Sequence, residues 1–275
     1  MLTEQRKALI LAALQSRGQA VAKDLAAELG VSEDTIRRDM RDMAAAGLLK
    51  RVHGGALPLS PDLPDLSARR NLSSDVKSAL GAKAASLIQP GQMVFLDGGT
   101  TTAQIARHLP RDIALTVATH SPTIAAEFEH HAHIEVILIG GRLYKHSMVS
   151  VGAAAMTAID ALRPDLFFLG VTAVHAVHGL STGDFEEAAI KRHISEASAE
   201  TYLTVTTDKL DRLSPCRIMA LDKLSGLIVP ADTDEDVLAP YRARAAGRHH
   251  APASTARRPP CRACRGGLCP PTRQA

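Results

Sequence analysis

Glycine and hydroxyl side chains gather where an apolar run ends, and this composition suits the binding of a phosphate group. The run 92–96 is followed by Asp97, Gly98, Gly99, Thr100, Thr101 and Thr102. Glycine lets a ligand approach the backbone closely, and the free N–H groups of the helix expected over 101–109 attract anions at its N-terminus. A tight turn capped by threonine explains the same residues equally well, so both interpretations stay open at this point.

Two further junctions after apolar runs carry similar residues. Their candidate ligand-binding residues are Thr119, His120, Ser121, Gly140 and Gly141. In the first junction Ser121 can cap a helix that starts at Pro122. In the second, two glycines supply a permissive backbone after the run 134–139. Parallel α/β sheets bind ligands beyond the carboxyl ends of their strands, which is where such junctions lie.

Arginines on one expected helix indicate a second kind of chemistry, which is contact with DNA. Ser32 can cap a helix that buries Ile36, Met40 and Met43 at i, i+4 and i+7. At about 100° per residue, three arginines point away from this apolar stripe. They are Arg37, Arg38 and Arg41. Guanidinium groups suit both guanine edges and phosphates in the major groove.

Two helical patterns precede this helix and a hairpin pattern follows it. The first runs over Thr3–Gln15, and the second ends at Gly30, a typical helix-ending residue. Residues 48–55 then alternate like a wing that grips the DNA backbone. Together these elements predict a winged helix-turn-helix, whose second helix enters the major groove. The alternative is a helical interaction domain with solvated arginines, which Asp39 and Asp42 among those arginines favour.

The rest of the chain alternates helical and extended patterns, which predicts a mostly parallel sheet covered by helices. Extended runs are expected at 92–96, 113–119, 134–139, 166–171, 201–206, 217–221 and 227–229. Helices are expected at 77–88, 101–109, 122–128, 153–162 and 185–199. We therefore predict a DNA-binding domain over 1–57, a proline-containing linker over 58–74 and an α/β sensor domain over 75–241.

The segments 31–40 and 47–56 resemble the DeoR family of bacterial transcriptional regulators. They read VSEDTIRRDM and GLLKRVHGGA, a specific combination of helix and wing. In that family the module binds operator DNA, usually to repress genes of sugar or nucleoside catabolism. The resemblance implies that Ser32, Thr35, Arg37 and Arg38 lie in the recognition helix and that Arg51 and His53 lie in the wing. With Arg41 from the helix geometry, these are the expected DNA-binding residues.

The resemblance covers about residues 3–230 and extends to the second domain. The family's second domain resembles ribose-phosphate isomerase and coenzyme A transferases and senses phosphorylated sugars. Its effector loops align with Asp97–Thr101, Thr119–Ser121 and the Gly140-Gly141 pair, so the resemblance implies that these residues line an effector pocket. An isomerase-like enzyme with an accessory nucleic-acid module is the alternative, but no dense acid-base constellation marks a reaction centre.

Two positions depart from the family pattern, and one lysine is ambiguous. His120 stands where the family usually has asparagine, and Asp208 lies directly before Lys209, where the family commonly has Asp-Ser-Ser-Lys. Lys191 follows Glu187 by four residues, which a surface ion pair explains, while the family pattern places a basic pair facing the ligand here. We carry Lys191 and Lys209 forward as effector-binding candidates.

Histidine and cysteine clusters do not add up to an expected metal site. The histidines fall in loops without an accompanying motif, and three late cysteines are one thiol short of an all-cysteine zinc site. The histidines are His130, His131, His133, His175 and His178, and the cysteines are Cys261, Cys264 and Cys269. Either His249 or His250 could supply a fourth ligand, yet no surrounding sequence would order such a site. We expect no metal and no cofactor.

The formal net charge of +3 averages three different segments. Residues 1–56 carry +2, residues 57–241 carry −7, and residues 242–275 carry eight arginines and no acidic residue. The last segment lacks apolar periodicity, so it is expected to be a disordered tail that either strengthens non-specific DNA binding or is an out-of-frame translation product. No apolar run reaches the 18 residues of a membrane span, and a cytoplasmic location is expected.

The combined hypothesis is a repressor of a carbohydrate-catabolism operon. Its N-terminal module would read double-stranded operator DNA as a homo-oligomer, and a phosphorylated sugar in the second domain would modulate that binding. The effector, the operator sequence and the direction of the response do not follow from the sequence.

Overall fold

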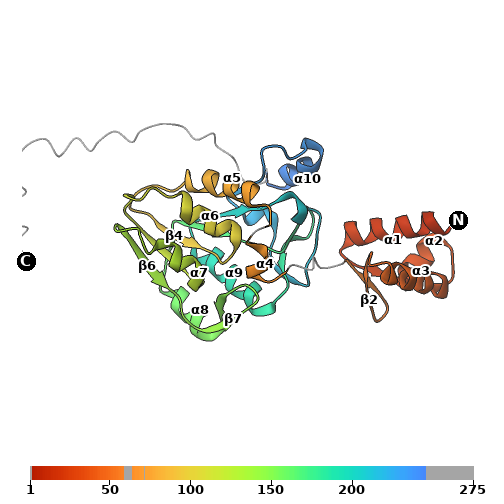
Figure 1. Ribbon diagram of the computed structural model, residues 1–275. Helices are drawn as coiled ribbons and strands as arrows, with labels where there is room; N and C mark the ends of the chain where they lie inside the picture. Colours follow the sequence, from red (N-terminus) through yellow and green to blue (C-terminus); the bar gives the residue numbers. More distant parts are fainter. Residues whose placement is uncertain (1, 59–63, 71, 246–275) are drawn as a thin grey trace, which may run out of the picture.

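The computed structural model describes residues 2–58, 64–70 and 72–245 (Figure 1). The expected tail over 242–275 therefore lies outside the described residues from position 246 onward. In the part of the chain that is described, no helix is both long and apolar enough to cross a membrane.

The N-terminal module is a three-helix unit with a small antiparallel sheet. Its elements are α1 (Thr3–Arg17), β1 (Ala20–Val21), α2 (Ala22–Leu29), α3 (Glu33–Ala45), β2 (Lys50–Val52) and β3 (Gly55–Leu57). The first two helices end at Gly18 and Gly30, both in the left-handed backbone conformation that glycine adopts without strain. The expected apolar stripe of Ile36, Met40 and Met43 is confirmed, because all three side chains are buried.

The expected wing forms and is tied to the helices. β2 and β3 pair antiparallel, and β1 adds a third strand in the order β1-β3-β2. At Gly55 a Cβ atom would lie 2.1 Å from the carbonyl oxygen of Ala20, so only glycine allows this close approach of two strands.

The second unit is built on a six-stranded parallel sheet, so the expected fold class is confirmed. Its strands are β4 (Met93–Leu96), β5 (Leu115–Thr119), β6 (Ile134–Leu138), β9 (Leu166–Leu169), β12 (Glu200–Thr204) and β14 (Gly226–Ile228). Their order is β14-β12-β9-β4-β5-β6, and every neighbouring pair is parallel. β9 is buried along its whole length, as expected for a strand covered on both faces.

Helices cover both faces of this sheet (Figure 1). They are α5 (Ser74–Ala85), α6 (Thr100–His108) and α7 (Pro122–Ala125) with the 3-10 turn Ala126–Phe128 on one face, and α8 (Ala153–Asp160) and α9 (Phe185–Ala197) on the other. Each face has its own hydrophobic core. Phe168 packs in the core beneath α5, α6 and α7, whereas Phe167, one residue earlier on the same strand, packs in the core beneath α8 and α9. This alternation follows from the period of two along a strand.

Small antiparallel elements stand beside the sheet. They are the hairpin β7 (Arg142–Tyr144) and β8 (Val149–Val151), and the sheet of β10 (Ala173–His175), β11 (Gly179–Thr182) and β13 (Cys216–Met219). Of their strands the sequence patterns predicted only β13. The extended run expected at 217–221 thus forms β13, which pairs antiparallel with β11. It does not join the parallel sheet, in which β14 is the neighbour of β12.

Two boundaries differ from expectation. The expected linker contains a short helix, α4 (Leu66–Arg69), because Asp65 accepts a hydrogen bond from the Ala68 N–H at 3.0 Å and Leu66 is buried. Helix α10 (Glu235–Ala245) continues past Tyr241, where the sensor domain was expected to end. Tyr241 is 1% exposed and its hydroxyl donates to Asp211 at 2.7 Å, which anchors the helix. The domain limits as a whole stay a prediction.

Candidate functional site

A cavity of about 190 Å³ opens where the strand order reverses. The chain passes outward from β4 through β5 to β6, and then returns to β9 on the other side of β4. Loops after β4 and β9 therefore diverge, and a crevice forms at their carboxyl ends. Gly98 after β4 and Gly170 after β9 line this cavity. Its size suits a small metabolite better than a drug-sized ligand.

The N-terminus of α6 faces this cavity. Five of the predicted effector residues, Gly98, Gly99, Thr100, Thr101 and Thr102, line it. The Ala103 N–H donates to the Gly99 carbonyl at 3.0 Å, so the N–H groups of the preceding threonines lie ahead of the helix's own hydrogen-bond ladder. Free N–H groups together with threonine hydroxyls can bind an anion.

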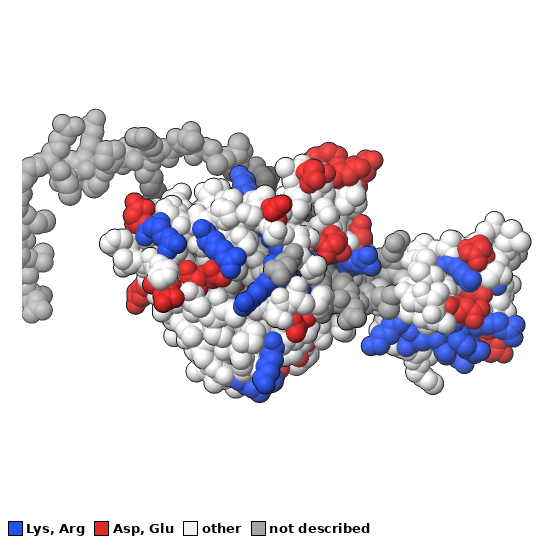
Figure 2. Space-filling view, viewed as in Figure 1, with Lys and Arg blue, Asp and Glu red and all other residues white. Residues whose placement is uncertain are grey.

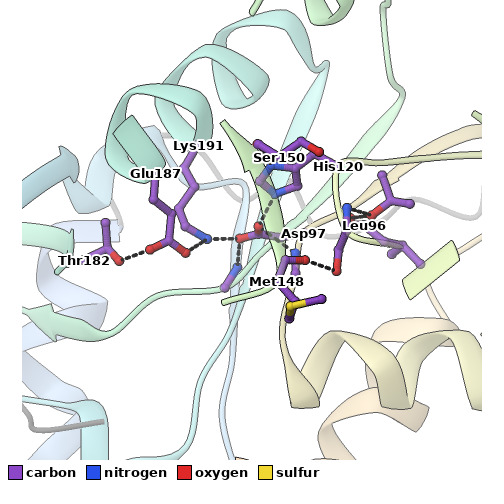
Figure 3. A network of polar contacts seen from close by, with 12 residues as sticks. Leu96, Asp97, His120, Met148, Ser150, Thr182, Glu187 and Lys191 are labelled. Atoms are coloured by element: carbon purple, nitrogen blue, oxygen red, sulfur yellow. Dashed lines mark hydrogen bonds and ion pairs between the residues drawn. The ribbon is translucent and has the colours of Figure 1, made fainter. Parts of the chain in front are cut away.

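Asp97 organises the floor of the cavity, and Figure 3 shows it between Lys191 and His120 in a network of polar contacts. The side chain is fully buried, and its oxygens accept hydrogen bonds from the N–H groups of Gly98 and Gly170, each at 2.8 Å. His120 Nε2 lies 2.9 Å from the same carboxylate, and Lys191 forms an ion pair with it. Asp97 therefore fixes the two loops that form the crevice, and it does not line the cavity itself.

The charge state of Asp97 follows from these partners. Burial by itself raises the pKa of the carboxyl group, but the charge of Lys191 and the hydrogen bond from His120 outweigh burial and lower the pKa to about 2. The carboxylate is thus ionised at any physiological pH.

Lys191 joins the floor to a second carboxylate. Its amino group lies 3.3 Å from Glu187 Oε1, and the Thr182 hydroxyl donates to Glu187 Oε2 at 2.9 Å. Burial lowers the pKa of Lys191, yet the charges of Asp97 and Glu187 prevail and raise it. The predicted pair with Glu187 is therefore present, but it is buried and not on the surface, because Lys191 is only 2% exposed. Lys191 also lines the cavity.

Lys209 is the second predicted lysine at the cavity. Its amino group donates to the Val171 carbonyl at 2.8 Å. Burial and then the charge of Arg69 lower its pKa to about 8. No carboxylate in the described ranges lies within 4.0 Å of its amino group, so this cation is available to an anionic ligand.

The structure does not bring every predicted effector residue to the cavity. The residues Thr119, His120, Ser121, Gly140 and Gly141 do not line it. The Thr119 hydroxyl donates to the Leu96 carbonyl at 2.7 Å, and the Ser121 hydroxyl donates to the Met148 carbonyl at 2.8 Å. Both side chains are buried and join neighbouring backbone segments.

His120 and the glycine pair are displaced from the cavity for different reasons. His120 Nδ1 lies 3.0 Å from the Ser150 carbonyl, so the ring connects Asp97 to the backbone of β8. Because both of its partners are acceptors, a ring that carries both protons satisfies both contacts. Gly140 and Gly141 follow β6, which is the edge strand of the sheet, and the crevice lies three strands' width toward β9.

Several lining residues were missed by sequence reasoning. Arg69 comes from α4, Tyr144 and His146 come from the β7–β8 hairpin, and Thr204 is the last residue of β12. The polar hairpin gave no periodic signal, and α4 spans only four residues. Only the alternation of the sheet could have indicated that the end of β12 faces the crevice.

The predicted DNA-binding residues share the outer face of α3 and the wing. Arg37, Arg38 and Arg41 are exposed, as are Arg51 and His53 in the wing. Ser32 caps α3 by accepting from the Thr35 N–H at 3.2 Å. Figure 2 shows Lys and Arg gathered along one side of this module.

Asp39 does not oppose these arginines, contrary to the sequence interpretation. The side chain is buried, and Arg6 of α1 donates to it at 2.7 Å and 3.2 Å. It therefore joins α1 to α3 beneath the exposed face. Of the two aspartates, only Asp42 is exposed on the same face as the arginines.

The histidines noted in the sequence do not converge. His131 is buried against Phe128, whereas His130 and His133 are exposed. The rings of His175 and His178 contact each other at a tilt of 45°, with their centroids 4.7 Å apart. In the described residues no group of three or more His, Cys, Asp or Glu side chains could hold a metal ion. The cysteines at 261, 264 and 269 lie outside those residues.

Two family models match this chain. Residues 6–61 match the DeoR-like helix-turn-helix domain, and residues 73–231 match the DeoR C-terminal sensor domain.

Individual proteins are similar over most of their length. The HTH-type transcriptional regulator GlpR of Haloferax volcanii is 32% identical over 86% of this chain and 93% of its own. The glycerol-3-phosphate regulon repressor of Haemophilus influenzae is 30% identical over 83% of this chain and 89% of its own. Among solved structures, ribose 5-phosphate isomerase A of Methanocaldococcus jannaschii aligns at 17% identity and a TM-score of 0.38, covering 50% of this chain and 54% of that one.

Proposed function

The chain belongs to the DeoR family of transcriptional regulators, and from that premise we propose that it represses a carbohydrate-catabolism operon in response to a phosphorylated sugar. One observation carries the proposal. The same chain holds a helix-turn-helix with exposed arginines and a cavity that combines a helix N-terminus with the side chains of Arg69, Lys191 and Lys209. The first is suited to operator DNA and the second to a phosphate group.

The effector acts through differential affinity. A ligand shifts an equilibrium between two arrangements of the DNA-binding modules only if it binds one arrangement more tightly than the other. The phosphate binds at the N-terminus of α6 and beside Lys209, and the sugar hydroxyls contact the polar side chains around them. The acidic sensor domain makes no operator contact of its own, and the protein acts in the cytoplasm, where the operator is.

The first test separates the two sites. Changing Arg37 and Arg38 together to alanine is expected to weaken binding to the DNA upstream of the protein's own gene by at least about thirtyfold, at about 1–3 kcal/mol for each lost contact. A gel shift measures the DNA binding, and a melting screen with phosphorylated sugars measures effector binding, which is expected to be unchanged.

A matched control removes the same charge elsewhere in the module. Lys7 and Arg17 lie on α1, and their joint change to alanine also removes two positive charges. If both double variants lose DNA binding equally, general electrostatics and not the outer face of α3 accounts for the loss. If operator binding persists in the Arg37 and Arg38 variant, the recognition helix is wrongly assigned.

The enzyme alternative receives no support from the relatives, which are named regulators and repressors. The chain is a regulator and not an enzyme. In the melting screen, the appearance of an isomerised product would contradict that conclusion.

A further inference from the structure

Helix α4 lies in the connector between the two modules and is fixed to the sensor. It falls between the two matched regions, which end at residue 61 and resume at residue 73. The N–H of Leu66 donates to the His146 carbonyl of the β7–β8 hairpin at 3.1 Å, and the Leu66 side chain is buried. The Lys77 amino group donates to the Arg69 carbonyl at 2.9 Å, which satisfies the end of the short helix. Both ends of α4 are therefore attached to sensor elements.

Arg69 points from this connector helix into the cavity. Its side chain lines the cavity together with Lys191 and Lys209. Its Nε atom is buried and has no hydrogen-bond partner among the residues described. In the same part of the chain no carboxylate lies within 4.0 Å of the guanidinium group. A buried donor without an acceptor is costly and rare in folded proteins, so a ligand oxygen is its natural partner.

The charge balance of the cavity agrees with an anionic ligand. The carboxylates of Asp97 and Glu187 are both engaged by Lys191, and Asp97 is also contacted by His120. Among the residues that the structure describes, no carboxylate forms an ion pair with Arg69 or Lys209. They lie close enough for the charge of Arg69 to lower the pKa of Lys209. An anion between them removes this repulsion and fills the fork of the guanidinium group.

We propose that Arg69 binds the anionic group of the effector, so that the connector helix itself forms part of the effector site and reports its occupancy to the DNA-binding module. The inference rests on the proposed function and deepens it. The bound phosphate joins α4 to the N-terminus of α6 and to Lys209. The phosphate adds a third attachment to the two that already hold α4 on the sensor, and the connector leaves the sensor from this helix. Operator binding changes because the position of α4 changes.

The binding half of the proposal is tested with three variants of the full-length chain. Arg69→Gln removes the charge, Arg69→Lys keeps the charge without the planar fork, and Arg70→Gln removes a charge from the adjacent position. Arg70 is exposed and lines a different hollow, of about 200 Å³, between α4 and α6. Isothermal calorimetry with inorganic phosphate, glycerol 3-phosphate, glucose 6-phosphate and fructose 1-phosphate supplies the affinities.

The expected pattern is specific to position 69. For the best-binding probe, Arg69→Gln is expected to weaken affinity at least about tenfold, Arg69→Lys by less, and Arg70→Gln by less than about twofold. Unchanged affinity in Arg69→Gln overturns the proposal. Equal weakening at both positions also overturns it, because the effect is then general charge. A loss confined to Arg70→Gln places the anion in the neighbouring hollow and overturns it as well.

Two measurements keep the test decisive. The melting temperature without probe shows whether Arg69→Gln is folded, and if it is not, the charge-conserving Arg69→Lys decides in its place. If the unmodified protein binds none of the four probes, the proposed sensing function fails, and this inference fails with it. If the unmodified protein binds a probe and the Arg69 variants bind it equally well, only this inference fails.

The reporting half needs an operator gel shift. The DNA affinity of Arg69→Gln and of the unmodified protein is first measured without probe, so that each protein supplies its own reference. With the probe at a saturating concentration for each protein, the change in DNA affinity is expected to shrink at least threefold in the variant. If saturating probe produces the full change in Arg69→Gln, the connector does not report occupancy and that half of the proposal is wrong.

Discussion

At the scale of single residues, the floor of the cavity is a buried polar network in which each charged group has a partner. Asp97 accepts from two backbone N–H groups, from Lys191 and from His120 (Figure 3). Such a network specifies one arrangement, because removal of any member leaves a buried group unsatisfied. The pKa of Asp97 lies below its ordinary value, so the ionised carboxylate stabilises the folded protein in a pH-dependent way. This contribution to the free energy of unfolding is complete above about pH 4 and is lost as the pH falls toward 2.

Lys191→Met is predicted to destabilise the protein by about 3–5 kcal/mol, because two buried carboxylates lose their shared cation. Urea unfolding followed by circular dichroism measures the change. The control is Lys223→Met, since Lys223 is exposed in a 3-10 turn and is expected to change stability by less than about 0.5 kcal/mol. Equal stability of the two variants would show that Lys191 is not essential to the floor.

Effector binding is predicted to weaken as the pH rises from 7 to 9. The pKa of Lys209 lies near 8, so the amino group is mostly charged at pH 7 and mostly neutral at pH 9. If only the charged form binds a phosphate dianion, affinity falls about tenfold over this range. The neighbouring charges of Arg69, Asp208, Lys77 and Lys191 act on the same titration.

Calorimetry at several pH values, with the best-binding phosphorylated sugar, gives this profile. Lys209→Met is expected to bind more weakly at pH 7 and to lose most of the dependence between pH 7 and 9. A profile that keeps its slope in Lys209→Met assigns the titration to another group.

At the scale of elements, the position of α6 decides whether its N-terminus faces the cavity. Gly81 sets this position, because α5 packs on α6 at this residue. A Cβ atom at Gly81 would lie 2.4 Å from Gln104 Cβ and 2.6 Å from the Gln104 carbonyl carbon. The two helix backbones therefore approach more closely than any side chain larger than hydrogen allows.

Gly81→Ala is predicted to be destabilising, by about 1–3 kcal/mol, although alanine favours helices. The gain in helix propensity is about 1 kcal/mol, and the overlap with the backbone of α6 outweighs it. Thermal unfolding checks the sign. Gly140→Ala is the control, since nothing lies within 4 Å of its Cβ position and its backbone is not in the left-handed region. A stabilised Gly81→Ala would mean that α5 and α6 shift apart without cost.

At the scale of the whole molecule, the charge is divided between modules with different roles. Lys and Arg side chains gather along one side of the N-terminal module in the view of Figure 2, whereas the net charge of residues 57–241 is −7. The second unit therefore repels DNA and leaves binding to the first. The overall value of +3 obscures this division.

The protein is predicted to read its operator as a homo-oligomer, because one helix-turn-helix contacts only a half-site. Size-exclusion chromatography with light scattering should therefore give a multiple of the chain mass of 29.2 kDa. A particle of one chain mass, both free and on operator DNA, would contradict this expectation.

Local patterns were sufficient to predict the module that meets DNA. The stripe of Ile36, Met40 and Met43 fixes which side of α3 is buried, and the arginines on the other side follow from the helix period. The alternation of strands and helices likewise predicted the parallel sheet and the threonine loop at its edge. These features depend on residues close together in the sequence, so the sequence by itself determined them.

Only the tertiary structure decided which residues meet at the cavity. Asp97 and Lys191 are 94 positions apart, and their contact depends on the strand order that sets β9 beside β4. The same order leaves Gly140 and Gly141 at the far edge and brings Arg69 in from the connector. Side-chain types can indicate that an anion site exists. Which residues form the site is decided by long-range packing, because contacts between residues this far apart leave no periodic pattern in the sequence.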